Sequence, residues 1–216
     1  LPSPTLVAFL SRPPSAPVMN RAHRRLEAVN TRHNRAGWLE AVTWVDEGGF
    51  GYAITAEGGS GLIRGRVLKA ALEAEARAFS GDGSGNALTA ANYTIEEEGE
   101  TEEGYVRLRL TPRRKEQMLI NGYVIVTKGD ARVVRVEGRL VKNPSFWTTH
   151  VDVARTYEVI DGHNMPVVLQ SHAELRMFGD SEFRMTIRYD TIEGRSEEHT
   201  SELQSHLNLV CRLLLE

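Results

Sequence analysis

Four side chains on two stretches of the sequence could hold a divalent metal ion. His150 and Asp152 stand two residues apart, and His172 and Glu174 repeat that spacing further along the chain. In extended strands, a spacing of two places both side chains on the same face. One strand register sets His150 opposite Glu174. The same register sets Asp152 opposite His172, so that two imidazoles and two carboxylates, all donors for transition metals, share one surface.

The same residues also have a simpler explanation. On an antiparallel sheet, complementary side chains face each other across neighbouring strands and stabilise the pairing. An open sheet surface neither excludes water nor encloses a substrate, so we expect cross-strand pairs here and no catalytic residues. The sequence therefore predicts no cofactor and no enzyme, and a metal-dependent enzyme remains an alternative hypothesis.

Long antiparallel strands are predicted to carry these residues. Apolar and polar residues alternate at 105–110, at 134–140 and most regularly in "SEFRMTIRYD" at 181–190. This period of two is typical of antiparallel sheets with one dry and one solvated face. Turn motifs near residues 129, 144, 162 and 180 leave strands of roughly 11 to 14 residues, which tend to curl. The pattern predicts an α+β fold whose long-stranded antiparallel sheet curls, with its apolar face wrapped around another sheet, a helix or a ligand.

The last hairpin allows a prediction of register. The apolar residues Phe183 and Met185 have to meet the apolar side of the preceding strand, since a slip of one residue would set them against charged side chains. A three-residue loop at 179–181 satisfies this condition. It places Met177 opposite Phe183 and Leu175 opposite Met185.

One helix is predicted from periodicity, at 61–79, with Ser60 as its N-cap. Its apolar side is rich in alanine, which suits close packing on a sheet, and we expect it to cover the concave face. A short helix is expected near 5–11. Further strands are expected at 21–29, 38–45 and 50–56.

The C-terminal residues 195–216 ("RSEEHTSELQSHLNLVCRLLLE") differ in character from the rest and include the only cysteine, Cys211. Read as codons, they resemble an in-frame translation of a common sequencing adapter. We therefore expect a non-native tail and exclude it from the fold. Residues 1–20 are then an N-terminal segment, and 21–194 form a single domain of ordinary size.

Charge and hydropathy exclude several classes of function. The formal net charge is −3 for the whole chain, and it becomes −1 when the two arginines and four glutamates of 195–216 are set aside. A nucleic-acid partner, which needs a concentrated basic face, is not expected. No apolar run approaches the ~20 residues that cross a bilayer, so no transmembrane span is expected either.

The order of these elements, with "LRLTPRR" at 108–114 and "YEVIDGHNMPVVL" at 157–169, resembles the LolA/LolB superfamily of bacterial outer-membrane lipoprotein carriers. The resemblance implies an unclosed β-barrel with helices at its mouth and a hydrophobic cavity for acyl chains. It also implies a periplasmic or exported protein. Residues that could line such a cavity, or alternatively pack as ordinary core, are Trp44, Met118, Trp147, Leu175, Met177, Phe183, Met185 and Ile187.

Three hypotheses about function follow. The first is non-enzymatic binding or transport of a lipid or lipoprotein acyl chain in the bacterial cell envelope. The second is a structural or interaction module of the envelope, with a protein partner, whose concave face is filled by its own helix. The third is the metal-dependent enzyme at His150, Asp152, His172 and Glu174.

Overall fold

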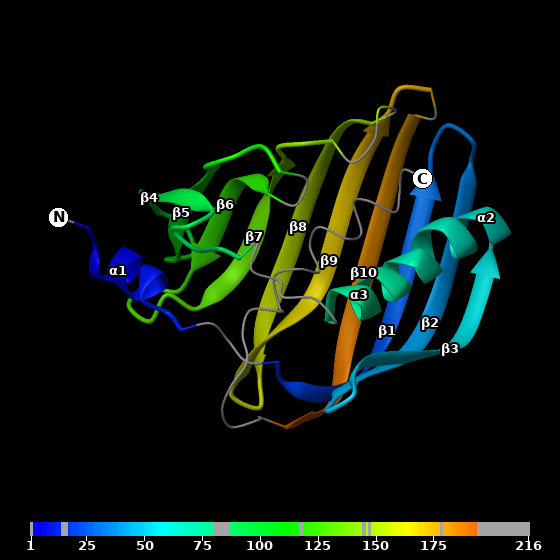
Figure 1. The fold of residues 1–216 in the computed structure, drawn as a ribbon, viewed down its shortest axis with the longest axis horizontal. Coiled ribbons are helices and arrows are strands. Elements are labelled where there is room, and N and C mark those ends of the chain that lie inside the picture. Colours follow the sequence, from blue (N-terminus) through cyan, green and yellow to red (C-terminus); the bar gives the residue numbers. More distant parts are fainter. Residues whose placement is uncertain are drawn as a thin grey trace.

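The computed structural model of the protein describes residues 2–13, 17–79, 87–116, 119–143, 146, 148–177 and 179–193. Two of the residues predicted to line a cavity, Met118 and Trp147, lie outside these ranges, as does the expected tail at 195–216. The described residues form an α+β fold built on one large antiparallel sheet (Figure 1). The prediction of the fold class is therefore confirmed.

Ten strands make up the sheet, in the spatial order β3-β2-β1-β10-β9-β8-β7-β6-β5-β4. Every neighbouring pair is antiparallel, and β3 and β4 are free edges, so the barrel is not closed. The strands are β1 Met19–Asn30, β2 Arg35–Asp46, β3 Gly49–Gly59, β4 Tyr93–Glu100, β5 Val106–Pro112, β6 Ile120–Val126, β7 Val133–Leu140, β8 Thr148–Ile160, β9 His163–Leu175 and β10 Gly179–Glu193.

Alternation divides the sheet into two chemically different faces. On β10, the apolar Phe183, Met185 and Ile187 are buried, whereas Arg184 and Arg188 on the other side are exposed. Similar patterns on β1, β5, β6 and β8 place their apolar side chains in the same core cluster. We call the apolar side the inner face and the charged side the outer face.

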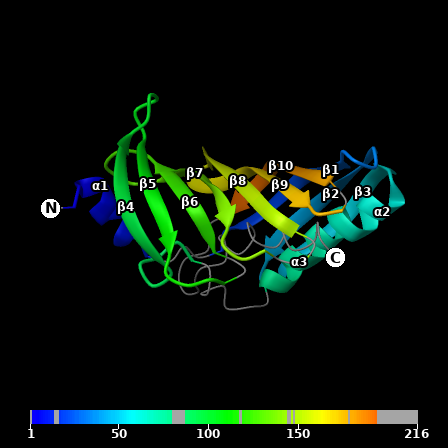
Figure 2. The same ribbon diagram turned by 90° about the horizontal axis from the view of Figure 1, so that it is seen from above.

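A helix lies along the inner face over the β1–β3 end of the sheet (Figures 1 and 2). It runs without interruption through α2 (Gly61–Ile63), the π-helical segment η1 (Arg64–Lys69) and α3 (Ala70–Phe79). The predicted range and apolar side are confirmed, because Val67, Leu68 and Leu72 pack in the core. The π-helical segment was not predicted. Ser60 occupies the N-cap position, but its side chain makes no capping hydrogen bond.

The second described helix, α1 (Pro4–Leu10), confirms the short N-terminal helix and lies near the opposite end of the sheet (Figure 1). Ser3 caps it by accepting a hydrogen bond from the Leu6 N–H at 3.1 Å. Thr5 Oγ1 accepts the N–H of Gly129 in the turn between β6 and β7, at 3.1 Å. Phe9 is buried in the same core as the sheet. The two helices thus contact opposite ends of one apolar face.

The predicted register of the last hairpin is wrong. Leu175 pairs with Gly179 and not with Met185, and Phe183 pairs with Ser171 and not with Met177. The turn comes before Gly179, which adopts φ +69° and continues into β10. The predicted loop at 179–181 therefore belongs to the strand.

The reason for the error is that the alternation argument fixes only whether residues face inwards. A slip by an even number of positions leaves every side chain on its own face, and the observed register differs from the predicted one by six. The chain just after β1 contacts both sides of the observed turn, since Arg32 Nη1 donates to the Met177 carbonyl at 2.8 Å and Thr31 N–H donates to the Asp180 carbonyl at 3.0 Å. These partners are far from the hairpin in sequence.

A pair of glycines lets β6 and β7 approach closely on the inner face. Gly122 pairs with Gly138, and a Cβ at Gly122 would lie 2.0 Å from the Glu137 carbonyl oxygen. No ordinary side chain fits there without moving a strand. The close approach therefore requires glycine at this point of the sheet.

We predict that Gly122→Ala lowers the free energy of unfolding by about 3 kcal/mol or more, because the added methyl overlaps backbone that has to shift. Gly65→Ala is the matched control. Nothing lies within 4 Å of a Cβ at Gly65, in the helix. Alanine at this position should raise the free energy of unfolding by at most about 1 kcal/mol. Urea unfolding of both variants measures the difference, and equal effects would contradict the overlap.

Candidate functional site

The inner face carries most of the described residues that were predicted to line an apolar cavity. Phe183, Met185 and Ile187 are buried there on β10 and belong to the core cluster. Leu175, at the end of β9, is half-buried. The structure thus brings the three β10 residues together with the helix.

Two of the predicted lining residues lie elsewhere. Trp44 is on the outer face, where its indole covers Gly51 so closely that a Cβ on that glycine would lie 2.4 Å away. Its neighbour Thr43 takes the buried position instead. Met177 is in the turn before β10 and is 60% exposed. Neither side chain lines the inner face, and both predictions are corrected.

A buried ion pair that was not predicted connects the sheet to the helix. Arg24, on β1, points inwards, and its Nη1 lies 2.5 Å from Oε2 of Glu75 on α3. Its Nε donates a hydrogen bond to Thr43 Oγ1 at 3.0 Å. The guanidinium also lies 5.0 Å from the centre of the Phe50 ring, a favourable cation–π geometry. The inner face is therefore not entirely apolar beneath the helix.

The enclosed space beside this pair is small. Its volume is about 30 Å³, and its lining includes Arg24, Glu75, Arg155, Met185 and Tyr189. Burial raises the pKa of the Tyr189 hydroxyl, which donates a hydrogen bond to the carbonyl oxygen of Pro166 on the neighbouring strand β9 at 2.9 Å. Such a space has room for about one water molecule among polar partners. It is far too small for an acyl chain.

We predict that Glu75→Ala lowers the free energy of unfolding by about 3 to 5 kcal/mol, because it leaves the Arg24 charge buried without its carboxylate. The double variant Arg24→Met/Glu75→Leu should recover most of the loss. Glu73→Ala is the control, since Glu73 lies on the same helix but is exposed, with its Oε2 4.0 Å from Arg77 Nη1. This substitution should change the free energy of unfolding by less than about 0.5 kcal/mol. Chemical unfolding of the three variants tests this, and a stable Glu75→Ala protein would refute it.

On the outer face, the predicted register of β8 and β9 is confirmed. His150 pairs with Glu174 and Asp152 pairs with His172. Nδ1 of His150 lies 3.3 Å from Glu174 Oε2, and its Nε2 lies 3.7 Å from Asp152 Oδ2. The four residues therefore share one surface patch, as the spacing predicted.

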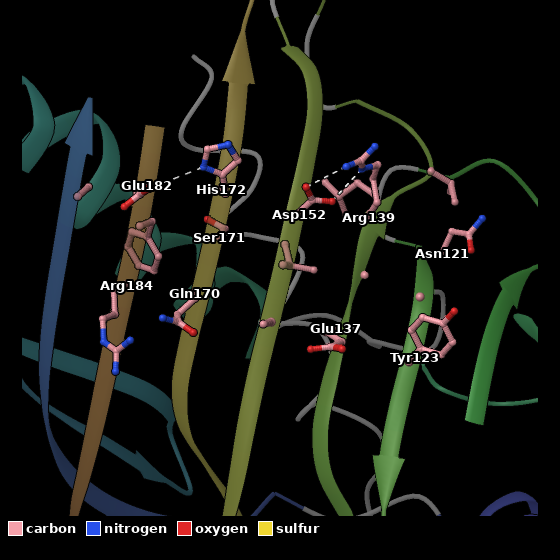
Figure 3. Close-up of a pocket in the computed structure, with 18 of the residues that line it drawn as sticks. Asn121, Tyr123, Glu137, Arg139, Asp152, Gln170, Ser171, His172, Glu182 and Arg184 are labelled. Carbon is pink, nitrogen blue, oxygen red and sulfur yellow. Dashed lines mark hydrogen bonds and ion pairs between the residues drawn. The ribbon is translucent and has the colours of Figure 1, made fainter. Parts of the chain in front are cut away.

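Asp152 is nevertheless engaged by a residue outside this set. Arg139 on β7 forms two hydrogen bonds with its carboxylate, at 2.8 and 3.0 Å (Figure 3). This pairing holds the pKa of Asp152 below, and that of Arg139 above, its ordinary value. The expectation of complementary cross-strand pairs thus describes Asp152 well, and this carboxylate is poorly placed to serve as a metal ligand.

An open groove crosses the outer face from β1 to β5 (Figure 3). Its volume is about 1290 Å³, and charged side chains of both signs line it, among them Arg139, Asp152, Glu182 and Arg184. His172 lies at one side of it with Glu182 next to it, 4.0 Å from His172 Nδ1 to Glu182 Oε1. The groove is wide and solvated, so it resembles a binding surface more than an enclosed active site.

One further residue near this patch was missed. Asp180 pairs with Glu174 across β9 and β10, and ligand atoms of His172, Glu174 and Asp180 all lie within 4.8 Å of one another. The predicted register had placed Asp180 in a loop. Asp180 could have been identified only with the correct register of the last hairpin, which alternation alone does not determine.

Neither a protein-family model nor a curated protein sequence matches the chain. None of the helices in the described ranges is long and apolar enough to cross a bilayer. The functional inference therefore rests on the geometry of the two faces.

Proposed function

We propose that this protein binds an apolar chain, such as the acyl chain of a lipid or lipoprotein, against the inner face of its open sheet, without catalysing a reaction. The observation that carries the proposal is a ten-stranded, unclosed sheet with an extensive apolar face and a helix laid along it.

We assign the chain to the part of the inner face between the two helices. Among the described helices, α1 lies near β4 to β6 and the helix at 61–79 lies towards β1 to β3, and neither lies over β7 and β8 (Figure 1). Apolar side chains of the core occupy this central part: Val136, Val151, Val153 and Leu169. Each methylene group of a bound chain that leaves water there contributes about 0.8 kcal/mol.

The available volume decides whether the chain binds at the centre of the inner face or under α3. The enclosed volume of about 30 Å³ beside Arg24 and Glu75 does not accept a chain. The central side chains are themselves buried, so a chain enters only as the packing over them opens. Binding should therefore be accompanied by a measurable change in the protection of the backbone amides of β7 and β8 against hydrogen exchange.

The resemblance to lipoprotein carriers supports the same proposal from the order of the elements. The resemblance also extends the proposal to an exported or periplasmic protein. Such a protein receives its ligand from an envelope protein partner or passes the ligand to one. An exchange of this kind needs no cofactor, in keeping with a binding role.

A second candidate, an envelope interaction module with a self-filled core, is favoured by one specific observation. The helix fills its part of the inner face completely, since Leu68 and Leu72 are fully buried there and the neighbouring space is small. In that case the core would be structural, and only the outer groove would meet a partner.

We predict that the delipidated protein takes up a fluorescent fatty acid, and that Val153→Phe weakens this binding about tenfold. The larger ring occupies space worth about two methylene contacts, or ~1.6 kcal/mol. Ala154→Phe is the matched control, because Ala154 is the next residue of β8 and lines the outer groove. The affinity of this variant for the fatty acid should stay within about twofold of the wild-type value. Fluorescence titration gives the affinities, and urea unfolding establishes that both variants fold.

Native mass spectrometry of the wild-type protein provides an independent measurement. A bound acyl chain in protein purified from a bacterial host, lost on delipidation and regained on incubation with lipid, supports the proposal. Wild-type protein that takes up no probe, or equal effects of the two phenylalanine variants, would favour the self-filled core instead.

A further inference from the structure

Six side chains of the outer face form two rows across β8, β9 and β10. Cross-strand pairing sets His150, Glu174 and Asp180 side by side in one row. It sets Asp152, His172 and Glu182 side by side in the next. Because neighbours on one strand face are two residues apart, each row lies directly beside the other. The arrangement concentrates two imidazoles and four carboxylates in a small area.

The charge of these rows favours a cation. Four carboxylates stand against one arginine, Arg139, which is committed to Asp152 by two hydrogen bonds. Within the two rows and Arg139, carboxylates outnumber guanidinium groups by three, and Arg184 stands two residues beyond Glu182 on the same face. Like charges held this close repel each other, and a bound divalent cation relieves that repulsion.

The six residues do not contribute equally. Asp152 is held by Arg139, whereas ligand atoms of His172, Glu174 and Asp180 come within 4.8 Å of one another. Glu174 is oriented by its neighbour, since Nδ1 of His150 lies 3.3 Å from Glu174 Oε2. The main chain at Asp180 is fixed as well, because its carbonyl accepts hydrogen bonds from both the N–H and the hydroxyl of Thr31.

We propose that His172, Glu174 and Asp180 bind a divalent transition-metal ion of the Zn²⁺ type, with His150 as a positioning residue for Glu174. An imidazole with two carboxylates suits such ions, whereas Ca²⁺ and Mg²⁺ prefer oxygen donors alone. Small side-chain rotations bring the three donor atoms from their present separations to metal-bonding distance. This site lies on the opposite face from the apolar-chain site and is independent of it.

Three protein ligands leave coordination positions open. The site adjoins the groove of the outer face, since His172 and Glu182 both belong to the groove lining. An ion held here is therefore accessible to a carboxylate, imidazole or phosphate group of a molecule lying in the groove. The metal would connect this protein to such a group on a partner.

The test is Zn²⁺ binding by the full chain, measured by calorimetry and by the visible spectrum of the Co²⁺ form. All proteins carry Cys211→Ser, because a thiolate in the C-terminal segment is itself a strong Zn²⁺ ligand. We expect one ion per chain at the patch, and at least about a 100-fold loss of affinity in His172→Gln and in Asp180→Asn, since even residues that only orient ligands are worth 10- to 100-fold. His150→Gln should lose about tenfold.

Matched controls come from a second His–Asp pair on the outer face, His23 and Asp190, which lie 3.1 Å apart on β1 and β10. His23→Gln and Asp190→Asn should bind Zn²⁺ as the wild type does. The proposal is overturned if wild-type protein binds no Zn²⁺, or if the control and site variants lose affinity alike. It is also overturned if Ca²⁺ binds as tightly as Zn²⁺ and His172→Gln has no effect, which would indicate a site of carboxylates only.

Discussion

Arg24 and Glu75 form an ion pair in a part of the molecule where most neighbouring side chains are apolar. A buried guanidinium without a counter-charge is strongly unfavourable, so the helix has to present Glu75 over β1 and cannot slide along the inner face. This constraint determines which end of the face the helix covers. It also determines what lies beneath the helix, namely a small polar space and not a cavity for a chain.

Alternation explains why so much of the fold could be predicted from the sequence. A strand with one apolar side, such as β10 with Phe183 and Ile187, specifies which of its side chains face inwards without reference to its partners. The helix at 61–79 is similarly local, because its apolar side and its start after Ser60 lie within one segment. Antiparallel pairing and the side on which the helix docks follow from these local patterns, whereas the open sheet was expected only from the resemblance to the lipoprotein carriers.

The errors have a different physical origin, since each depends on residues distant in sequence. Arg24 stands in a strand rich in charged residues, and nothing local says that it points inwards to meet Glu75. Trp44 is apolar but occupies the outer face, because the polar Thr43 is needed inside as a partner for Arg24. The position of Asp180 depended on a hairpin register whose turn contacts Thr31 and Arg32, far away in sequence.

The register of β10 affects the two faces unequally. A slip of two residues would still set apolar side chains against apolar side chains, so burial of the inner face selects weakly among such registers. On the outer face the same slip would remove Asp180 from Glu174 and Glu182 from His172. The metal-donor set thus depends on a small number of polar contacts at the turn between β9 and β10, such as those of Arg32 with the Met177 carbonyl and Thr31 with the Asp180 carbonyl, that the core itself does not require. A substitution at Arg32 that permits the slip would alter the outer face while leaving the apolar face still able to pack, which physically separates the two sites.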